Sequence, residues 1–165
     1  MDKPRQLSSL AVAAFLVVLT ACPSMLPAPS YRTLAKRADS LGVACNQAAA
    51  RFAAAPSGET RQELQGRLTE LNEALIETSG YEQEARRANS TDLIDANRAF
   101  LETGRAWANC SLQYNAVLVV TGERDAARHN YEGLLARLAG PQFVAERRRI
   151  QAAMNELGPV PVLPP

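Results

Sequence analysis

The 165-residue sequence contains one histidine, His129, the side chain whose ordinary pKa best suits acid–base catalysis near neutral pH. Asp125 precedes His129 by four residues, and on a helix this spacing places a carboxylate beside the imidazole, as in a catalytic dyad. The same spacing also describes an ordinary exposed pair on a helix, and no G-x-S-x-G motif supplies a nucleophile. We therefore expect no enzymatic activity, and a catalytic centre at His129 is the least favoured alternative.

The sequence contains none of the common metal or cofactor motifs. A structural zinc site usually takes four ligands, some of them closely spaced, but the chain has neither C-x-x-C nor H-E-x-x-H. It also has no C-x-x-C-H for haem attachment, no P-loop and no G-x-G-x-x-G. We expect no metal site and no cofactor.

Two groups of charged residues are candidates for interaction with a partner. Four glutamates recur every seven residues: Glu63, Glu70, Glu77 and Glu84. Three arginines are consecutive: Arg147, Arg148 and Arg149. The glutamates form either a solvated helix flank or an acidic docking surface, while the arginines either pack their stems on the core or contact an anionic surface, a cell-wall polymer or an acidic partner. A formal net charge of only +1 argues against a nucleic-acid partner.

The three cysteines divide into one near the N-terminus and two in the body of the chain. Cys45 and Cys110 both occupy inward positions of expected helices. An oxidising compartment would favour a disulfide between them, closing a loop of about 65 residues. The alternative is a pair of buried free thiols.

The N-terminal segment has the pattern of an export signal. Lys3 and Arg5 form a basic start, and residues 10–19 (LAVAAFLVVL) are all apolar. Ten residues rise only about 15 Å as a helix, roughly half of a ~30 Å hydrocarbon core. We therefore expect a cleavable signal instead of a permanent transmembrane span.

The end of this segment, Leu19-Thr20-Ala21-Cys22, resembles the lipobox of bacterial prolipoproteins. The resemblance implies a diacylglycerol on the Cys22 thiol, cleavage between Ala21 and Cys22, and acylation of the new amino group. Two or three acyl chains hold a protein stably on a membrane, whereas one binds marginally. Pro23 in place of aspartate implies the outer membrane, facing the periplasm, if the source has two membranes. The alternative is a soluble secreted protein cut near Ala21.

The remaining sequence predicts an all-α domain between Pro-rich ends. We expect a removed signal peptide over 1–21, a lipidated cysteine and Pro-rich tether over 22–30, a helical domain over 31–158 and a Pro-rich tail over 159–165. Apolar residues recur at helical spacing, and no segment alternates with the period of a strand. The simplest packing is an up-and-down bundle of four to five helices. A tetratricopeptide-like solenoid has weaker support because a strict repeat is missing.

These patterns favour a binding function over catalysis. We expect a lipid-anchored envelope protein that acts as a binding, assembly or structural module, with another envelope protein or a cell-wall component as its partner. The alternative is a small-ligand carrier with a pocket lined by Trp107, Tyr114 and Phe100. Removal of residues 1–21 would leave equal numbers of basic and acidic side chains. Local groups must therefore set specificity, because bulk charge cannot.

Overall fold

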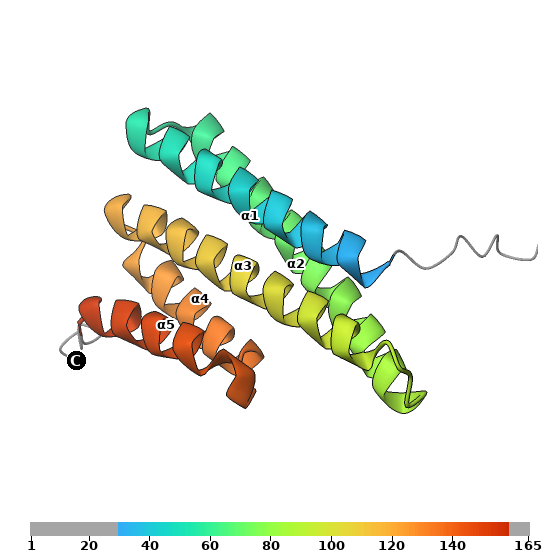
Figure 1. Ribbon diagram of the computed structural model, residues 1–165. Helices are drawn as coiled ribbons and strands as arrows, with labels where there is room; N and C mark the ends of the chain where they lie inside the picture. The colour runs from blue at the N-terminus through green and yellow to red at the C-terminus, as the bar shows by residue number, and fades with distance from the viewer. Residues whose placement is uncertain (1–29, 159–165) are drawn as a thin grey trace, which may run out of the picture.

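A computed structural model describes residues 30–158, and nearly all of them are helical (Figure 1). The five α-helices are α1 (Tyr31–Ala54), α2 (Gly58–Arg87), α3 (Leu93–Val120), α4 (Arg124–Arg137) and α5 (Val144–Glu156), with a short 3₁₀ helix, η1 (Pro141–Phe143), before α5. No strand occurs among these residues. The predicted all-α bundle of four to five helices is confirmed.

Several of the sequence-based expectations fall on other parts of the chain. The signal peptide, the cleavage site at Ala21, the lipidated Cys22 and nearly all of the tether lie before residue 30, and the Pro-rich tail begins at residue 159, so all of them lie outside the described residues. Within residues 30–158, no helix combines the length and the apolar character needed to cross a bilayer.

Hydroxyl side chains begin the first two helices. Ser30 Oγ accepts a hydrogen bond from the backbone N–H of Thr33 at 3.3 Å at the start of α1. At α2, Ser57 Oγ accepts from the Thr60 N–H at 3.1 Å, and Thr60 Oγ1 accepts from the Ser57 N–H at 3.1 Å. This reciprocal pair is a capping box, and it satisfies donors that the first turn leaves free. The break at Pro56-Ser57-Gly58 is therefore built into the sequence.

Helix α3 is the helix that all the others pack against. It contacts α1 and α2 on one side and α4 and α5 on the other (Figure 1). Contact on two sides requires small side chains around much of its circumference, because large ones would hold the neighbouring helices apart. Its small buried residues are Ala96, Ala99, Thr103, Gly104, Ala108 and Ser111. These residues let α3 pack in two places: with α1 and α2 in a three-helix unit, and against the hairpin of α4 and α5.

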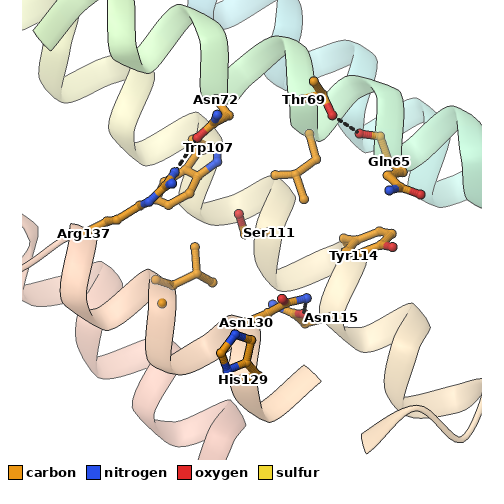
Figure 2. Close-up of a pocket in the computed structure, with 13 residues that line it drawn as sticks. Gln65, Thr69, Asn72, Trp107, Ser111, Tyr114, Asn115, His129, Asn130 and Arg137 are labelled. Carbon is orange, nitrogen blue, oxygen red and sulfur yellow. Dashed lines mark hydrogen bonds between the residues drawn. The ribbon is translucent and has the colours of Figure 1, made fainter. Parts of the chain in front are cut away.

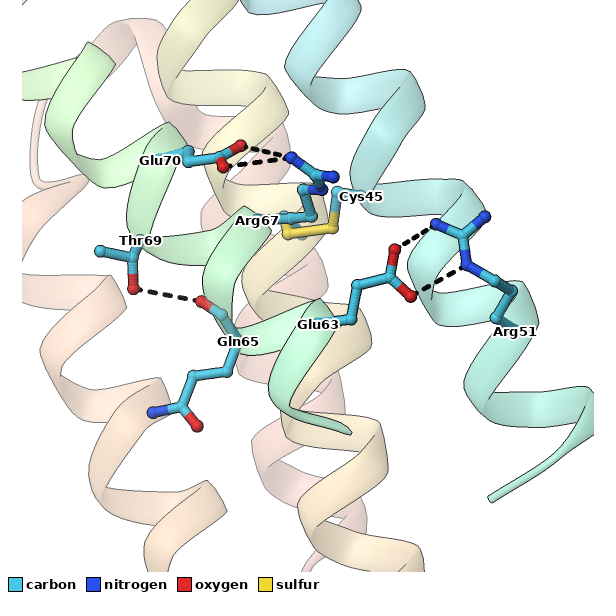
Figure 3. Close-up of polar contacts among 8 residues, drawn as sticks. Cys45, Arg51, Glu63, Gln65, Arg67, Thr69 and Glu70 are labelled. Carbon is cyan, nitrogen blue, oxygen red and sulfur yellow. Dashed lines mark hydrogen bonds and ion pairs between the residues drawn. A yellow bond between two sulfur atoms is a disulfide. The ribbon is translucent and has the colours of Figure 1, made fainter. Parts of the chain in front are cut away.

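A disulfide joins α1 to α3 inside the three-helix unit. Cys45 and Cys110 have Cα atoms 5.8 Å apart, and each residue is 1% exposed. The predicted bridge between them is therefore confirmed (Figure 3). Leu64 and Leu71 of α2 lie fully buried in the same core. The covalent link thus lies at the centre of the apolar packing that holds the first three helices together.

Candidate ligand-binding site

A pocket of about 490 Å³ opens between α2, α3 and α4 (Figure 2). Helix α3 supplies its floor through residues 107, 111, 114 and 115, whose spacing places them on one helical face. The α2 and α4 helices contribute the two walls. The volume lies in the range of sites that hold small molecules in other proteins.

One end of the pocket is formed by an arginine packed on a tryptophan. The guanidinium carbon of Arg137 lies 5.6 Å from the centroid of the Trp107 ring, and its Nη1 donates to Asn72 Oδ1 at 2.6 Å. Trp107 is buried, whereas Arg137 is exposed. The three residues come from α3, α4 and α2, so this contact fixes the direction of the guanidinium at the point where the three helices meet.

The pocket floor also contains two buried polar side chains. Asn115 is 1% exposed, and its Oδ1 accepts a hydrogen bond from Nδ2 of Asn130 at 3.0 Å. Ser111 is 2% exposed, and its Oγ has no hydrogen-bond partner in the structure. Figure 2 shows Ser111 directed from α3 into the space between α2 and α4. Because a buried hydroxyl without a partner loses free energy, this oxygen indicates a missing partner in the pocket.

The charges around the pocket have one sign. Its lining contains no aspartate or glutamate, and its two basic side chains are Arg137 and His129. Among residues 30–158, none of the ion pairs includes Arg137. The lining is otherwise neutral and rich in carboxamides and hydroxyls. The pocket therefore suits a ligand that is polar and carries negative charge.

The single histidine, His129, lies at this pocket but does not pair with Asp125 as a catalytic dyad would require. His129 is exposed and lines the pocket from α4. Neither a hydrogen bond nor an ion pair joins it to Asp125 in the described part of the chain. Nor do three or more histidine, cysteine, aspartate or glutamate side chains gather into a possible metal site between residues 30 and 158.

The predicted glutamate row lies away from the pocket, on the flank of α2 that faces α1. Glu63 forms an ion pair with Arg51 across the α1–α2 contact (Figure 3). Glu77 Oε2 accepts a hydrogen bond from Arg37 Nη1 at 2.9 Å across the same contact. Glu70 pairs within α2, with Arg67 at 3.0 Å. Glu84 is exposed and takes part in none of the ion pairs found among residues 30–158. This arrangement favours a solvated flank over an acidic docking surface.

The arginine run of α5 is also separate from the pocket. All three side chains are exposed. Arg149 Nη1 donates to Asn109 Oδ1 of α3 at 2.6 Å, while Arg147 and Arg148 border a shallow hollow beside Leu135. Two of the three arginines are thus presented on the outer side of the α4–α5 hairpin.

The structure brings Trp107 and Tyr114 together in the pocket but places Phe100 elsewhere. Phe100 meets Phe143 edge to face, with ring centroids 5.6 Å apart. Residue 100 shares the helical face of Trp107, but it lies two turns earlier, where η1 covers it. Its expected place in the lining is therefore wrong.

Sequence reasoning missed the polar side chains of the pocket. Ser111 and Asn115 follow Trp107 by four and eight residues, so they occupy inward positions among apolar ones. Buried polar side chains need hydrogen-bond partners, so polar residues at inward helix positions were the signal that could have identified the pocket floor. Helix α4 supplies the residues that contact this floor, Asn130 and Arg137. No comparable pattern in the local sequence marks these two residues.

Comparison with known proteins identifies no relative of this chain. No protein-family model matches the sequence, and neither the curated proteins nor the solved structures give a match. The side chains of the pocket are therefore the main indication of what the protein binds.

Proposed function

We propose that the protein is a lipid-anchored binding module of the bacterial cell envelope. The N-terminal pattern that ends in Leu19-Thr20-Ala21-Cys22 supports export and lipidation of Cys22. The disulfide between Cys45 and Cys110 fits an oxidising envelope compartment, because such bonds persist there and are rare in reducing cytosol. Pro23 after the lipidated cysteine supports the outer membrane, facing the periplasm, in a source with two membranes.

The binding role is carried by the pocket between α2, α3 and α4. Its floor contains the unpartnered Oγ of Ser111, and its rim carries an arginine without a carboxylate partner among the described residues. A purely structural bundle gains nothing from a buried hydroxyl without a partner, since this group would be more stable when paired. We infer that the partner, an envelope protein or a cell-wall component, makes contact here.

A second candidate function is that of a small-ligand carrier. The observation that favours it is the position of Trp107 and Tyr114 in a pocket large enough for a small molecule. A carrier would hold a free small molecule, whereas a binding module would hold a group that belongs to a macromolecule. The two functions therefore differ in whether the bound species is attached to the envelope.

The anchor is tested by growing cells that express the protein with an alkyne-tagged fatty acid. The wild-type protein should become labelled and fractionate with membranes, whereas the Cys22→Ser variant should be neither labelled nor retained. Absence of label on the wild-type protein would refute the anchor.

The binding role is tested by photo-crosslinking in intact cells. A photoreactive amino acid replaces Gln65, which is exposed at the pocket, and in a matched control it replaces Lys36, which is exposed on α1. Adducts with an envelope protein or with cell-wall fragments should form from position 65 and not from position 36. Adducts only with free small molecules would favour the carrier, and the same adducts from both positions would contradict a role for the pocket.

A further inference from the structure

We propose that the pocket between α2, α3 and α4 binds a saccharide unit that carries a carboxylate, through Arg137 and Ser111. This inference rests on the proposed function, since it names the ligand class of the same binding module. The argument uses three properties of the pocket: the state of its arginine, the nature of its neutral groups and the unpartnered hydroxyl on its floor.

Arg137 is prepared to bind a carboxylate. Its guanidinium packs on Trp107, and one of its five N–H groups is used by Asn72. The remaining donors have no carboxylate partner within residues 30–158, and no acidic side chain lines the pocket. A planar guanidinium held in one direction binds carboxylates in a two-point contact at little further loss of side-chain freedom.

The neutral groups of the pocket match the substituents of a sugar. The side chains that line the pocket with Arg137 include the hydroxyl residues Thr69 and Tyr114 and the carboxamide residues Gln65 and Asn130 (Figure 2). Hydroxyls and carboxamides both donate and accept, as do the hydroxyl and acetamido groups of sugars. Thr69 Oγ1 donates to the Gln65 carbonyl and Asn130 Nδ2 donates to Asn115, but the other hydrogen-bonding sites of these side chains stay open to a ligand. An apolar ligand would cover those open sites, and a bare anion would leave most of them unused. A polar ligand with one anionic group uses both parts of the lining.

Ser111 supplies a contact on the pocket floor. Its Oγ is buried, directed into the pocket and without a partner in the protein. A sugar hydroxyl or amide that enters between the side chains covering this oxygen would satisfy it and recover the free energy lost on its burial. Ser111 therefore contributes to binding without contributing to folding, and this separation can be measured.

The chain contains its own reporter for the test. Trp107 is the only tryptophan and lines the pocket, so its fluorescence should respond to an occupied site. The lipidated, oxidised protein in detergent is titrated with N-acetylmuramic acid, and separately with N-acetylglucosamine, lactate and inorganic phosphate. N-acetylglucosamine has the same acetamido sugar ring without the lactyl carboxylate.

We expect a saturable change with N-acetylmuramic acid and an affinity at least about tenfold weaker for N-acetylglucosamine, because the second sugar leaves Arg137 unpaired. Equal affinities for the two sugars would overturn the role of the carboxylate. An equal response to lactate or phosphate alone would show a site for any small anion, and no response to any probe would also overturn the proposal.

Two variants test the assigned contacts and a third serves as the control; binding is measured by calorimetric titration, since Arg137 touches the fluorophore. Arg137→Gln should weaken N-acetylmuramic acid binding about tenfold or more. Arg148→Gln removes the same charge from an exposed site outside the pocket and should leave the affinity unchanged. Ser111→Ala should weaken binding severalfold while leaving the melting temperature unchanged or raised, because the lost Oγ has no partner in the protein. Equal affinity in all three variants would exclude these contacts.

The outcomes separate this proposal from the proposed function. If the fatty-acid label and the adducts from position 65 are found but no saccharide binds, the binding module stands and only the ligand class is wrong. If the label and the adducts are missing while N-acetylmuramic acid binds, the saccharide site stands without the envelope role.

Discussion

The ring of Phe143 occupies the space that a side chain at Gly104 would fill. A Cβ added to Gly104 would lie 2.6 Å from Cζ of Phe143, closer than real Cβ atoms approach a neighbour. Gly104 is a buried residue of α3, and Phe143 is a buried residue of η1 just before α5. The α4–α5 hairpin is therefore packed on α3 at a point where only glycine leaves enough room.

Replacing this glycine should destabilise the protein. Gly104→Ala must displace the Phe143 ring, and overpacking of this kind costs about 1–3 kcal/mol, which outweighs the better helix propensity of alanine. Urea unfolding followed by circular dichroism measures the change. In the matched variant Gly80→Ala, the added Cβ meets nothing within 4 Å, so stability should rise by about 0.5–1 kcal/mol. Equal effects of the two substitutions would contradict the close contact at Gly104.

Loss of the disulfide should lower stability more than any other change considered. Its two cysteines are 65 residues apart in sequence, and closing a loop of that length in the unfolded chain is worth on the order of 4 kcal/mol. The variant with both Cys45→Ala and Cys110→Ala should lose roughly this amount in a guanidinium unfolding curve. A thiol assay on the denatured, unreduced mature protein provides the control. Detection of two free thiols would show that the bond does not form.

The ion pair between Arg61 and Glu123 should make stability depend on pH. Arg61 Nη2 donates to Glu123 Oε2 at 2.8 Å, and this hydrogen bond is the main cause that lowers the pKa of Glu123 below its ordinary 4.5. A carboxyl with a lowered pKa in the folded state adds stability above its unfolded pKa, and that stability is lost as pH falls through the folded pKa. The contribution should therefore be present above about pH 4.5 and decline below it.

Melting temperatures measured from pH 3 to pH 7 test this dependence. Glu123→Gln should flatten the acid limb of the curve, because the neutral side chain cannot titrate. Glu132→Gln removes an exposed carboxylate of α4 that forms no ion pair among the described residues and should leave the slope nearly unchanged. An identical slope for wild type and Glu123→Gln would contradict the coupling to Arg61.

Asn130 should stabilise the protein through the buried carboxamide of Asn115. Asn130→Ala removes the donor to Asn115 Oδ1, and a buried acceptor without a partner costs about 1–3 kcal/mol. A variant that combines Asn130→Ala with Asn115→Leu removes both polar groups and should recover part of the loss. Urea unfolding of the two variants gives the comparison. If the double variant is no more stable than Asn130→Ala, the cost does not come from the unpaired carboxamide.

The helices could be predicted from the sequence because their signals are local. The break at Pro56-Ser57-Gly58 contains the capping serine. Leucines at spacings of three and four residues mark the inward face of α2, and two of them are fully buried: Leu64 and Leu71. The cysteine pair was predictable for the same reason, since helical spacing turns both residues inward, and the export expected from the N-terminal pattern would favour their oxidation.

The pocket could not be predicted in the same way, because its contacts join residues from different helices. Arg137 lies over Trp107, and Asn130 donates to Asn115. Both contacts exist because α4 packs across α3 at this point. The contact of Phe143 with Gly104, which packs η1 on α3, is likewise a pairing across 39 positions that no local period encodes. Helix faces follow from spacing, but the partner of each face depends on the whole packing arrangement.

The position of the disulfide also determines how the chain transmits mechanical force. Tension applied to the two ends of the described chain passes through the sulfur–sulfur bond from α1 directly to α3, bypassing α2 altogether. The chain between the cysteines, which are 65 residues apart in sequence, then adds nothing to the extension. The disulfide thus holds back a contour length of about 230 Å, at ~3.6 Å per residue. A stretched protein of this design would transfer load first to the helix that contacts all the others, and would release the hidden length only on reduction.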